Sequence, residues 1–416
     1  LSKASLEHYL KVCGKQFSKL LSSQQVQAEA DRVWCGVERC LFGNGKELHF
    51  KKLMDFDTIG GKSNKNGARF DLDAMYVNWL GLSLKCYLPK SENSLSYVWE
   101  SLKGKISYCN IKRLMFSSGW RYYAEIVVSG AAPTRVSIGT STMGIDPGVS
   151  TIAGVSEDAC VLEELAPNAI QYEKKIQKIS QSMDRSRRIS NPNKYNEDGT
   201  INRSNRDPWK YSKNYVKMCR LLKSLYRKKH AYIVDSHRKL CNKLITIARY
   251  FPVEKMHFQA LQKKATDTKR QEKKTEVKQK DGTVKVIQKY KRKKRFGRSI
   301  NRRAPARFLL ELKRKAEAVG GVYAEVDTKE FKASQYNHVT DAYEKIPLSQ
   351  REKEIGNRKV QRDLYSAFLI RNADLDFKHP DREKCEYEFG HFANLQEQLI
   401  LKMKESGLSM RQCFGF

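Results

Sequence analysis

The chain has 416 residues, and 79 Lys and Arg against 46 Asp and Glu give it a formal net charge of +33 at pH 7. Because self-repulsion of this size opposes compaction, the surplus indicates a polyanionic partner such as a nucleic acid. We find neither a membrane-spanning apolar run nor a signal peptide, so a membrane partner is not expected. The length is typical of roughly two to four domains.

Ten cysteines are scattered along the chain, and none forms a CxxC pair. In a chain of this length and charge, that spacing predicts free thiols in a reducing compartment rather than a disulfide framework. Cys35 and Cys40 fall on a helical pattern and are expected to be buried thiols. The sequence begins at Leu1, so we expect a few residues to precede it.

In the first third of the chain, the hydrophobic pattern changes near residue 45 from helical to strand-like spacing. Residues 5–42 follow helical spacing and predict two helices. From 47 to 130, period-two alternation with Gly and Asn breaks predicts a small antiparallel barrel or sheet. The clearest strand there is 81–87, in which Leu82, Leu84 and Cys86 share one face.

A new unit opens near residue 143 with a strand-turn-strand pattern. Residues 263–303 contain 18 Lys and Arg against 4 Asp and Glu, and a hairpin is predicted around Asp281-Gly282. The other predicted elements are helices at 166–189, 209–250 and 307–318, a strand at 321–326, a helix from 364 to 370 and a C-terminal helix within 375–416.

Three acidic residues stand out because they lie in short segments far apart. Asp146 follows a strand-like run, Glu254 ends a hydrophobic approach, and Asp363 begins a helical segment. Each has an ordinary alternative, since turns, strand ends and helix caps also use acids. The gaps of 108 and 109 residues mean that only a fold can bring them together. Their shared order matches ribonuclease-H-like nuclease folds.

Converging carboxylates repel one another and raise their own pKa values, so such a cluster makes sense around a hard divalent cation. Magnesium takes oxygen ligands, and two ions about 3.5–4 Å apart can clamp the attacking and leaving oxygens of a phosphodiester. We therefore predict that Asp146, Glu254 and Asp363 are catalytic residues that hold two Mg²⁺ ions.

Residues 209–230 hold eight Lys and Arg and no acid, interleaved with aromatic residues. An amphipathic helix with a solvated basic face and a helix that tracks a nucleic-acid backbone explain this pattern equally well. On the second interpretation, the contact residues are Trp209, Lys213, Tyr215, Lys217, Arg220 and Arg227. The run Lys291, Arg292, Lys293, Lys294 and Arg295 reads as a localisation-type signal, a lid or, favoured beside a nuclease site, a further nucleic-acid contact.

From roughly residue 105 to 370 the chain resembles the TnpB family and its relatives, the compact type V CRISPR effectors. Gly144-Ile145-Asp146-Pro147-Gly148 resembles the first RuvC motif of that family, and Val253-Glu254-Lys255-Met256 resembles the second. Arg362-Asp363 followed by Ser366-Ala367 resembles the third. The resemblance rests on the order and spacing of these motifs together.

One departure from the family concerns zinc. Family members usually carry two Cys pairs between a Ser-Gln, here Ser334-Gln335, and the third motif, whereas residues 331–384 contain no cysteine. Zinc needs thiolate or imidazole ligands, and His338 alone cannot hold it. We expect no zinc, and expect 331–362 to be a degenerate zinc ribbon that is lost or rebuilt without metal.

The resemblance implies an α+β multidomain fold. Residues 1–45 would form a helical recognition lobe, 46–140 a wedge-like antiparallel β-barrel, and 141–416 a ribonuclease-H-like RuvC domain. Insertions into the RuvC domain would be helical at 166–250 and a basic hairpin or lid at 263–303.

The implied function is that of an RNA-guided DNA endonuclease. Its partners would be a guide RNA and target DNA, bound by a monomer or by a dimer on one RNA, in a prokaryotic cytoplasm near the nucleoid. The alternatives are a guide-RNA-dependent DNA-binding protein without cleavage and a basic structural RNA-binding protein. The presence of all three acids argues against both. The source of the guide, the flanking DNA motif and the cut pattern stay open.

Overall fold

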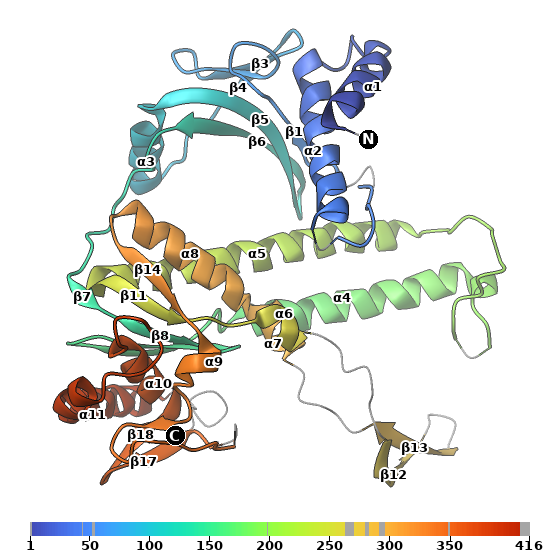
Figure 1. Ribbon diagram of the computed structural model, residues 1–416. Helices are drawn as coiled ribbons and strands as arrows, with labels where there is room; N and C mark the ends of the chain where they lie inside the picture. Colours follow the sequence, from blue (N-terminus) through green and yellow to red (C-terminus); the bar gives the residue numbers. More distant parts are fainter. Residues whose placement is uncertain are drawn as a thin grey trace. The chain divides into compact units, whose positions relative to one another are not determined.

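The protein is a mixed α+β chain of helices and several small sheets (Figure 1). The computed structural model describes residues 2–43, 45–51, 55–197, 199–262, 270–278, 283–290, 296–347 and 350–407. The chain divides into two compact units: Leu1–Pro133 with Ile176–Arg227 form the first, and Thr134–Lys175 with Lys228–Phe416 form the second. None of the helices described is long and apolar enough to cross a membrane.

The first unit begins with the two predicted helices, α1 (Lys3–Lys15) and α2 (Ser23–Leu41), and this prediction is confirmed. The helix α2 starts with a capping box between Ser22 and Gln25, which satisfies backbone donors at its N-terminus. Cys35 is exposed and Cys40 half-buried, so the expectation of buried thiols is wrong. The buried positions of α2 are Gln25 and Ala30 instead.

Two three-stranded sheets follow in the first unit. The strands β1 (Thr58–Ile59), β5 (Lys105–Phe116) and β6 (Gly119–Ser129) form one antiparallel sheet in the order β1-β5-β6. The strands β2 (Arg69–Asp71), β3 (Tyr76–Trp79) and β4 (Leu82–Lys85) form the other, also antiparallel. The helix α3 (Glu92–Leu102) connects the sheets, and the two share one core around Phe70, Val77 and Cys109.

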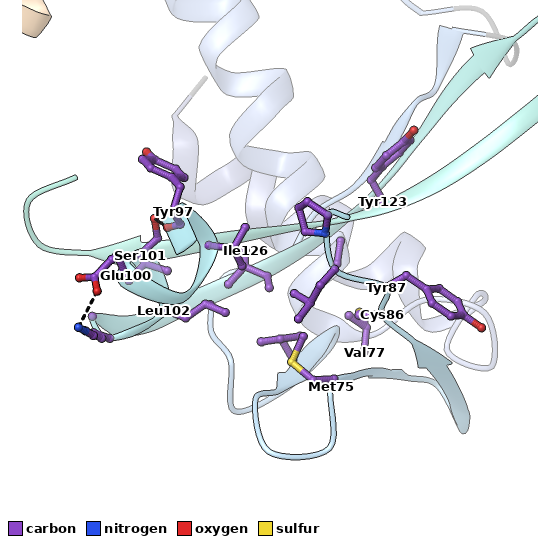
Figure 2. Close-up of a pocket in the computed structure, with 18 of the residues that line it drawn as sticks. Met75, Val77, Cys86, Tyr87, Tyr97, Glu100, Ser101, Leu102, Tyr123 and Ile126 are labelled. Atoms are coloured by element: carbon purple, nitrogen blue, oxygen red, sulfur yellow. Dashed lines mark hydrogen bonds and ion pairs between the residues drawn. The ribbon is translucent and has the colours of Figure 1, made fainter. Parts of the chain in front are cut away.

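The predicted barrel is not closed among the described residues, because the strands divide between two sheets. All four residues of β4 are exposed, so the face that Leu82 and Leu84 were predicted to share is not buried in a core. Period-two alternation indicates a strand but does not reveal whether a further strand covers its apolar side. The missing cover leaves an open groove of about 1400 Å³, lined by apolar and aromatic side chains (Figure 2).

Two long helices belong partly to each unit. They are α4 (Ala169–Ser190) and α5 (Lys213–Ile247), and the division falls after Lys175 in α4 and after Arg227 in α5. The loop between them contains the short 3₁₀ helix η2 (Pro192–Lys194). The Asn191 side chain donates to the carbonyls of Arg187 and Lys210, at 2.8 Å each, and so closes the loop at its base.

A six-stranded sheet organises the second unit. Its strands are β7 (Ser141–Thr142), β8 (Gly144–Pro147), β9 (Thr151–Val155), β10 (Cys160–Glu164), β11 (Ala248–Glu254) and β14 (Val322–Val326). The order is β10-β9-β8-β11-β14, with β7 also paired to β11. The strands β8, β9 and β10 pair antiparallel, whereas β11 is parallel to both β8 and β14. The predicted helix at 209–250 thus ends three residues early, because β11 begins at Ala248.

Helices cover both faces of this sheet. The C-terminal half of α5 and the helix α8 (Pro305–Ala318) pack on one face, around Ile145, Val253 and Phe308. The helices α10 (Arg362–Arg371) and α11 (Arg382–Glu405) pack on the other face, and Figure 1 shows them on the side of β8 opposite α8. The sheet is therefore buried between two apolar layers, and this packing holds the strands in place.

The remaining elements are short. The strands β12 (Arg270–Lys278) and β13 (Val284–Tyr290) pair antiparallel and confirm the predicted hairpin, whose turn at Asp281-Gly282 lies outside the described residues. The others are α6 (Phe258–Gln262), α7 (Gly297–Arg303), α9 (Thr328–Phe331), β15 (Tyr336–Asn337), β16 (Ala342–Tyr343), β17 (Glu352–Ile355) and β18 (Arg358–Gln361). Of these, β15–β16 and β17–β18 form two hairpins in the region expected to be a degenerate ribbon.

Candidate functional site

Two of the predicted acids lie on adjacent parallel strands. Ile145 of β8 is paired with Val253 of β11, and both are fully buried on the face covered by α5 and α8. Because side chains alternate along a strand, the next residues, Asp146 and Glu254, both point to the opposite face. Both residues are half-buried.

A glycine brings the third acid to the same face. A Cβ at Gly144 would lie 2.2 Å from the carbonyl oxygen of Ala367 and 2.4 Å from the backbone nitrogen of Arg371. The helix α10 therefore rests directly on the backbone of β8, an approach that any side chain would block. Asp363 lies in the first turn of α10 and is also half-buried. The structure thus brings together three acids that are 108 and 109 residues apart in sequence.

The three carboxyl groups interact electrostatically. Burial raises the pKa of Asp146 well above its usual value, and the negative charges of Glu254 and Asp363 raise it further, while Arg362 lowers it. Asp146 and Glu254 are hydrogen-bonded to each other, and burial together with Asp363 raises the pKa of Glu254 as well. A shared proton or a cation would relieve this repulsion.

Arginines hold both oxygens of Asp363. Arg351 Nη1 donates to Oδ2 at 3.1 Å, while Arg362 Nε and Nη2 donate to Oδ1 at 3.2 Å and 3.0 Å. Arg362 Nη1 also donates to the carbonyl oxygen of Gln350. Neither arginine was part of the predicted site, although Arg362 is the neighbour of Asp363 in the third motif.

The donor set suits a hard divalent cation in its chemistry, because it consists of carboxylate oxygens. The hydrogen-bonded Asp146 and Glu254 pair, with both pKa values raised, is an arrangement that a cation would stabilise. In the part of the chain that the structure describes, however, no group of three or more His, Cys, Asp or Glu is arranged to hold a metal ion. Asp146 and Glu254 supply carboxylate oxygens of the kind that such an ion prefers, whereas both oxygens of Asp363 are engaged by arginines.

The first unit carries a basic groove on the N-terminal half of α5. Lys213, Lys217 and Arg220 are exposed and line it at helical spacing, so three of the predicted nucleic-acid contacts share one surface. Tyr211 and Ser117 also line this groove, which has a volume of about 590 Å³. Tyr215 stacks on Tyr211, with ring centroids 4.6 Å apart.

Two other predicted contacts are engaged inside the first unit. Trp209 has Arg187 and Lys194 over its ring, at 5.4 Å and 5.2 Å from the centroid, and Tyr195 at its edge. Arg227 covers the ring of Phe116 at 3.8 Å and donates to the carbonyl oxygen of Met115. These contacts leave the two side chains less accessible than the lysines of the groove. The five residues from Lys291 to Arg295 lie outside the described residues.

Sequence reasoning missed a set of cation–aromatic contacts at the tip of the β5–β6 hairpin. Arg121 and Arg227 flank the ring of Phe116, and Arg113 and Lys223 approach the ring of Trp120 at 4.3 Å and 4.8 Å. Contacts of this kind contribute roughly 0.5–1 kcal/mol each at exposed sites. They hold the hairpin tip against α5 beside the basic groove. The available signal was the presence of four aromatic residues and two arginines within 113–123.

Figure 2 shows a second, apolar groove in the first unit, whose lining includes Tyr87, Tyr97, Tyr123, Met75, Val77 and Ile126. Tyr87 is 86 % exposed, and Lys85 Nζ lies 6.0 Å from the centroid of its ring. Basic residues stand at the rim: Lys85, Lys90, Lys103 and Arg121. Aromatic rings beside cations are the usual platform for unpaired nucleic-acid bases.

The hairpins at 336–361 support α10 without cysteine. Tyr336, Ile355 and Val360 are buried in the same core as α10 and α11. His338 is buried too, with its Nδ1 2.8 Å from the hydroxyl of Tyr365, and burial lowers its pKa to about 4. An aromatic and aliphatic cluster thus fills the region in which the resemblance places a zinc ribbon.

Comparison with known proteins gives one finding on structure. No known family profile matches the chain, and no curated protein matches it. Among solved structures, a cryo-EM ternary complex of CRISPR-Cas12f aligns over 92 % of this chain and 75 % of that chain, with 13 % sequence identity and a TM-score of 0.30. A likeness at this TM-score does not define a shared fold.

Proposed function

We propose that this chain is an RNA-guided DNA endonuclease whose RuvC-type site hydrolyses target DNA with two Mg²⁺ ions. The observation that supports this most strongly is the convergence of Asp146, Glu254 and Asp363. The three acids stand at the ends of β8 and β11 and at the start of α10. Two antiparallel pairings followed by two parallel ones, with acids in these places, agree with a ribonuclease-H-like fold.

In this mechanism the three acids hold the metal. Bound Mg²⁺ would activate a water and neutralise the charge that develops on the phosphodiester. Asp146 and Glu254 share a face of the sheet, and α10 carries Asp363 close enough to both for their charges to interact. Arg362 stays beside the cluster as a positive charge that favours ionised carboxylates.

The proposed partners are a guide RNA and its target DNA. A net charge of +33 needs polyanionic neutralisation, and phosphates are the natural partners of Lys213, Lys217 and Arg220. Unpaired bases would stack on the tyrosines of the apolar groove, each contributing roughly 1–3 kcal/mol. Sequence would be read by base pairing, since the basic and aromatic surfaces offer backbone and stacking contacts.

The test is cleavage by the protein together with the RNA that copurifies with it. That RNA is sequenced, and DNA matching its unpaired segment is offered with Mg²⁺. We expect cutting by the wild type, and loss of more than about 10³-fold in Asp146→Asn, Glu254→Gln and Asp363→Asn, because a misplaced ion no longer activates its water. Binding of RNA should persist in all three variants.

Asp327→Asn is the matched control. Asp327 also follows a strand of the same sheet, but its side chain caps α9 by accepting from the backbone N–H of Lys329 at 2.8 Å. Asn caps helices about as well as Asp, so this variant should fold and cut normally. Normal cutting by Asp363→Asn would contradict the assignment. Specific cutting by RNA-free protein would favour a self-sufficient nuclease.

A second candidate is a guide-RNA-dependent DNA-binding protein that does not cleave. The ion pairs of Asp363 with Arg351 and Arg362 favour it, because they occupy the oxygens that a metal needs. The same cleavage assay discriminates: tight, RNA-dependent binding of matched DNA without strand scission in Mg²⁺ or Mn²⁺ would support the second candidate.

A further inference from the structure

The Asp363 carboxylate is fully engaged within the protein. Its side chain is 13 % exposed, and each of its oxygens accepts from a guanidinium. Asp146 and Glu254, in contrast, have each other as hydrogen-bond partners. One of the three acids is therefore neutralised by cations of the chain itself, while the other two are not.

The two arginines differ in how firmly they are held. The Arg362 side chain is 9 % exposed, bonds Asp363 through two nitrogens and bonds the carbonyl oxygen of Gln350 with a third. The Arg351 side chain is 30 % exposed and reaches Asp363 Oδ2 through one nitrogen at 3.1 Å. Single-point, partly exposed ion pairs are weak, so Arg351 is the partner that can leave.

We propose that Arg351 is a positioning residue that competes with the metal for Asp363. In the protein without nucleic acid, the ion pair with Arg351 occupies Oδ2 of Asp363. When Mg²⁺ binds, Arg351 releases that oxygen, and Asp363 completes the ligand set while Arg362 continues to hold Oδ1. This inference rests on the proposed metal site.

The competition follows from charge and geometry. A cation that approaches Asp146 and Glu254 needs further oxygen ligands and is repelled by the nearby guanidinium. Removing the Arg351 charge frees one oxygen and removes one repulsion, and both changes favour metal. Loss of a purely structural ion pair would instead loosen the site and weaken metal binding, so the sign of the effect separates the two roles.

The test measures Mn²⁺ binding to RNA-free, full-length protein by electron paramagnetic resonance of the free ion. Mn²⁺ serves as the probe because it prefers oxygen ligands as Mg²⁺ does. We expect Arg351→Gln to bind Mn²⁺ about 3- to 10-fold more tightly than the wild type, as loss of a weak ion pair allows. Arg351→Lys, which keeps the charge, should stay within about twofold of wild type.

Arg358→Gln is the matched control, because Arg358 begins β18 of the same hairpin region and contacts Asn394 and Glu397. It should bind Mn²⁺ as the wild type does. Glu254→Gln should abolish Mn²⁺ binding, and with that result in hand, unchanged or weaker Mn²⁺ binding in Arg351→Gln would overturn the proposal. If Glu254→Gln changes nothing, the metal site itself is wrong, and the competition falls with it.

A second measurement separates the affinity for metal from the maximal rate of cleavage. In the cleavage assay, Arg351→Gln should reach half-maximal rate at about 3- to 10-fold lower Mg²⁺ concentration, matching the Mn²⁺ result. An unchanged Mg²⁺ requirement would contradict the competition even if the maximal rate fell.

Discussion

Single residues at the candidate site show why sequence reasoning reached the acids and missed their partners. Asp146, Glu254 and Asp363 were recognised because each stands at a characteristic junction of strand, turn or helix. Arg351 carries no such mark, because its role depends on a side chain that reaches across 12 residues to Asp363. Long, flexible arginine side chains follow no recognisable sequence pattern, because the tertiary structure determines which residues they contact.

Trp209 illustrates the opposite case. Its aromatic character and basic surroundings predicted a stacking surface for nucleic acid. In the structure, Arg187 and Lys194, which lie 22 and 15 residues earlier in the sequence, approach its own ring. Aromatic and basic residues can form a cation–π cluster within the protein or a surface that binds nucleic acid. The sequence alone does not distinguish the two.

Buried histidines predict an acid-sensitive second unit. Burial lowers the pKa of His338 and of His237 to about 4, below the roughly 6.5 of an unfolded chain. Below pH 6.5 the unfolded state therefore binds more protons, so stability is complete above that pH and is lost as the pH falls towards 4. Each histidine should contribute a loss of roughly 2 kcal/mol between pH 7 and pH 5.

Urea unfolding at pH 7 and pH 5 measures this effect. His338→Asn should reduce the difference in unfolding free energy between the two pH values by roughly 2 kcal/mol. The matched control is His391→Asn, because the His391 side chain is exposed on α11 of the same unit. An identical pH difference in His338→Asn and wild type would contradict the assignment.

At the scale of elements, the periodicity of the sequence predicted most helices and strands, but it did not predict which strands pair with one another. The strands β5 and β6 lie in the segment 47–130 that was predicted to be antiparallel, yet the predicted barrel is not closed among the described residues. The helix α3 was overlooked, although Leu95, Val98 and Leu102 have helical spacing after Ser91. The local sequence pattern predicts a helix or a strand. Which strands pair with one another depends on the packing of the whole unit.

The close packing of α10 on β8 makes a sharp prediction. In Gly144→Ala the new Cβ would overlap the backbone of α10, so the helix must move away from the strand. We expect a loss of about 3 kcal/mol or more in unfolding free energy. Cleavage should also be lost at temperatures at which the variant is still folded, because Asp363 moves with the helix.

Gly390→Ala is its control, since Gly390 lies in α11 and an added Cβ there meets no atom within 4 Å. That variant should be more stable by roughly 0.5–1 kcal/mol, because alanine restricts the unfolded chain. Thermal unfolding of both variants gives the comparison. Wild-type stability in Gly144→Ala would mean that α10 does not rest on β8.

The two ribbon-like hairpins predict a protein without stoichiometric zinc. Asn337 and Thr340 stand near the place where the family has a cysteine pair. Neither an amide nor a hydroxyl oxygen replaces the thiolates that zinc prefers. Metal analysis of chelator-washed protein should therefore find none, and one tightly held zinc per chain would overturn this.

At the scale of the whole molecule, the charge surplus predicts salt-dependent association with RNA. Removing one cation that binds a phosphate should reduce the slope of log affinity against log salt by about 0.7–0.9. We expect Lys213→Gln, Lys217→Gln and Arg220→Gln each to do so in titrations of the copurified RNA. Lys239→Gln is the control, because Lys239 is exposed on α5 but paired with Asp235 at 2.9 Å. Wild-type slopes in all three groove variants would exclude the groove as a phosphate-binding surface.

The three acids are synthesised at different times, because they lie far apart along the chain. Every strand of the six-stranded sheet precedes α10, so Asp363 leaves the ribosome after both strand acids and after most of the basic surface. On the proposed function, a nascent chain gains the capacity to hold nucleic acid before it gains the capacity to cut. Protein synthesis would then separate the two activities in time, and the growing chain could collect its RNA while still harmless to DNA.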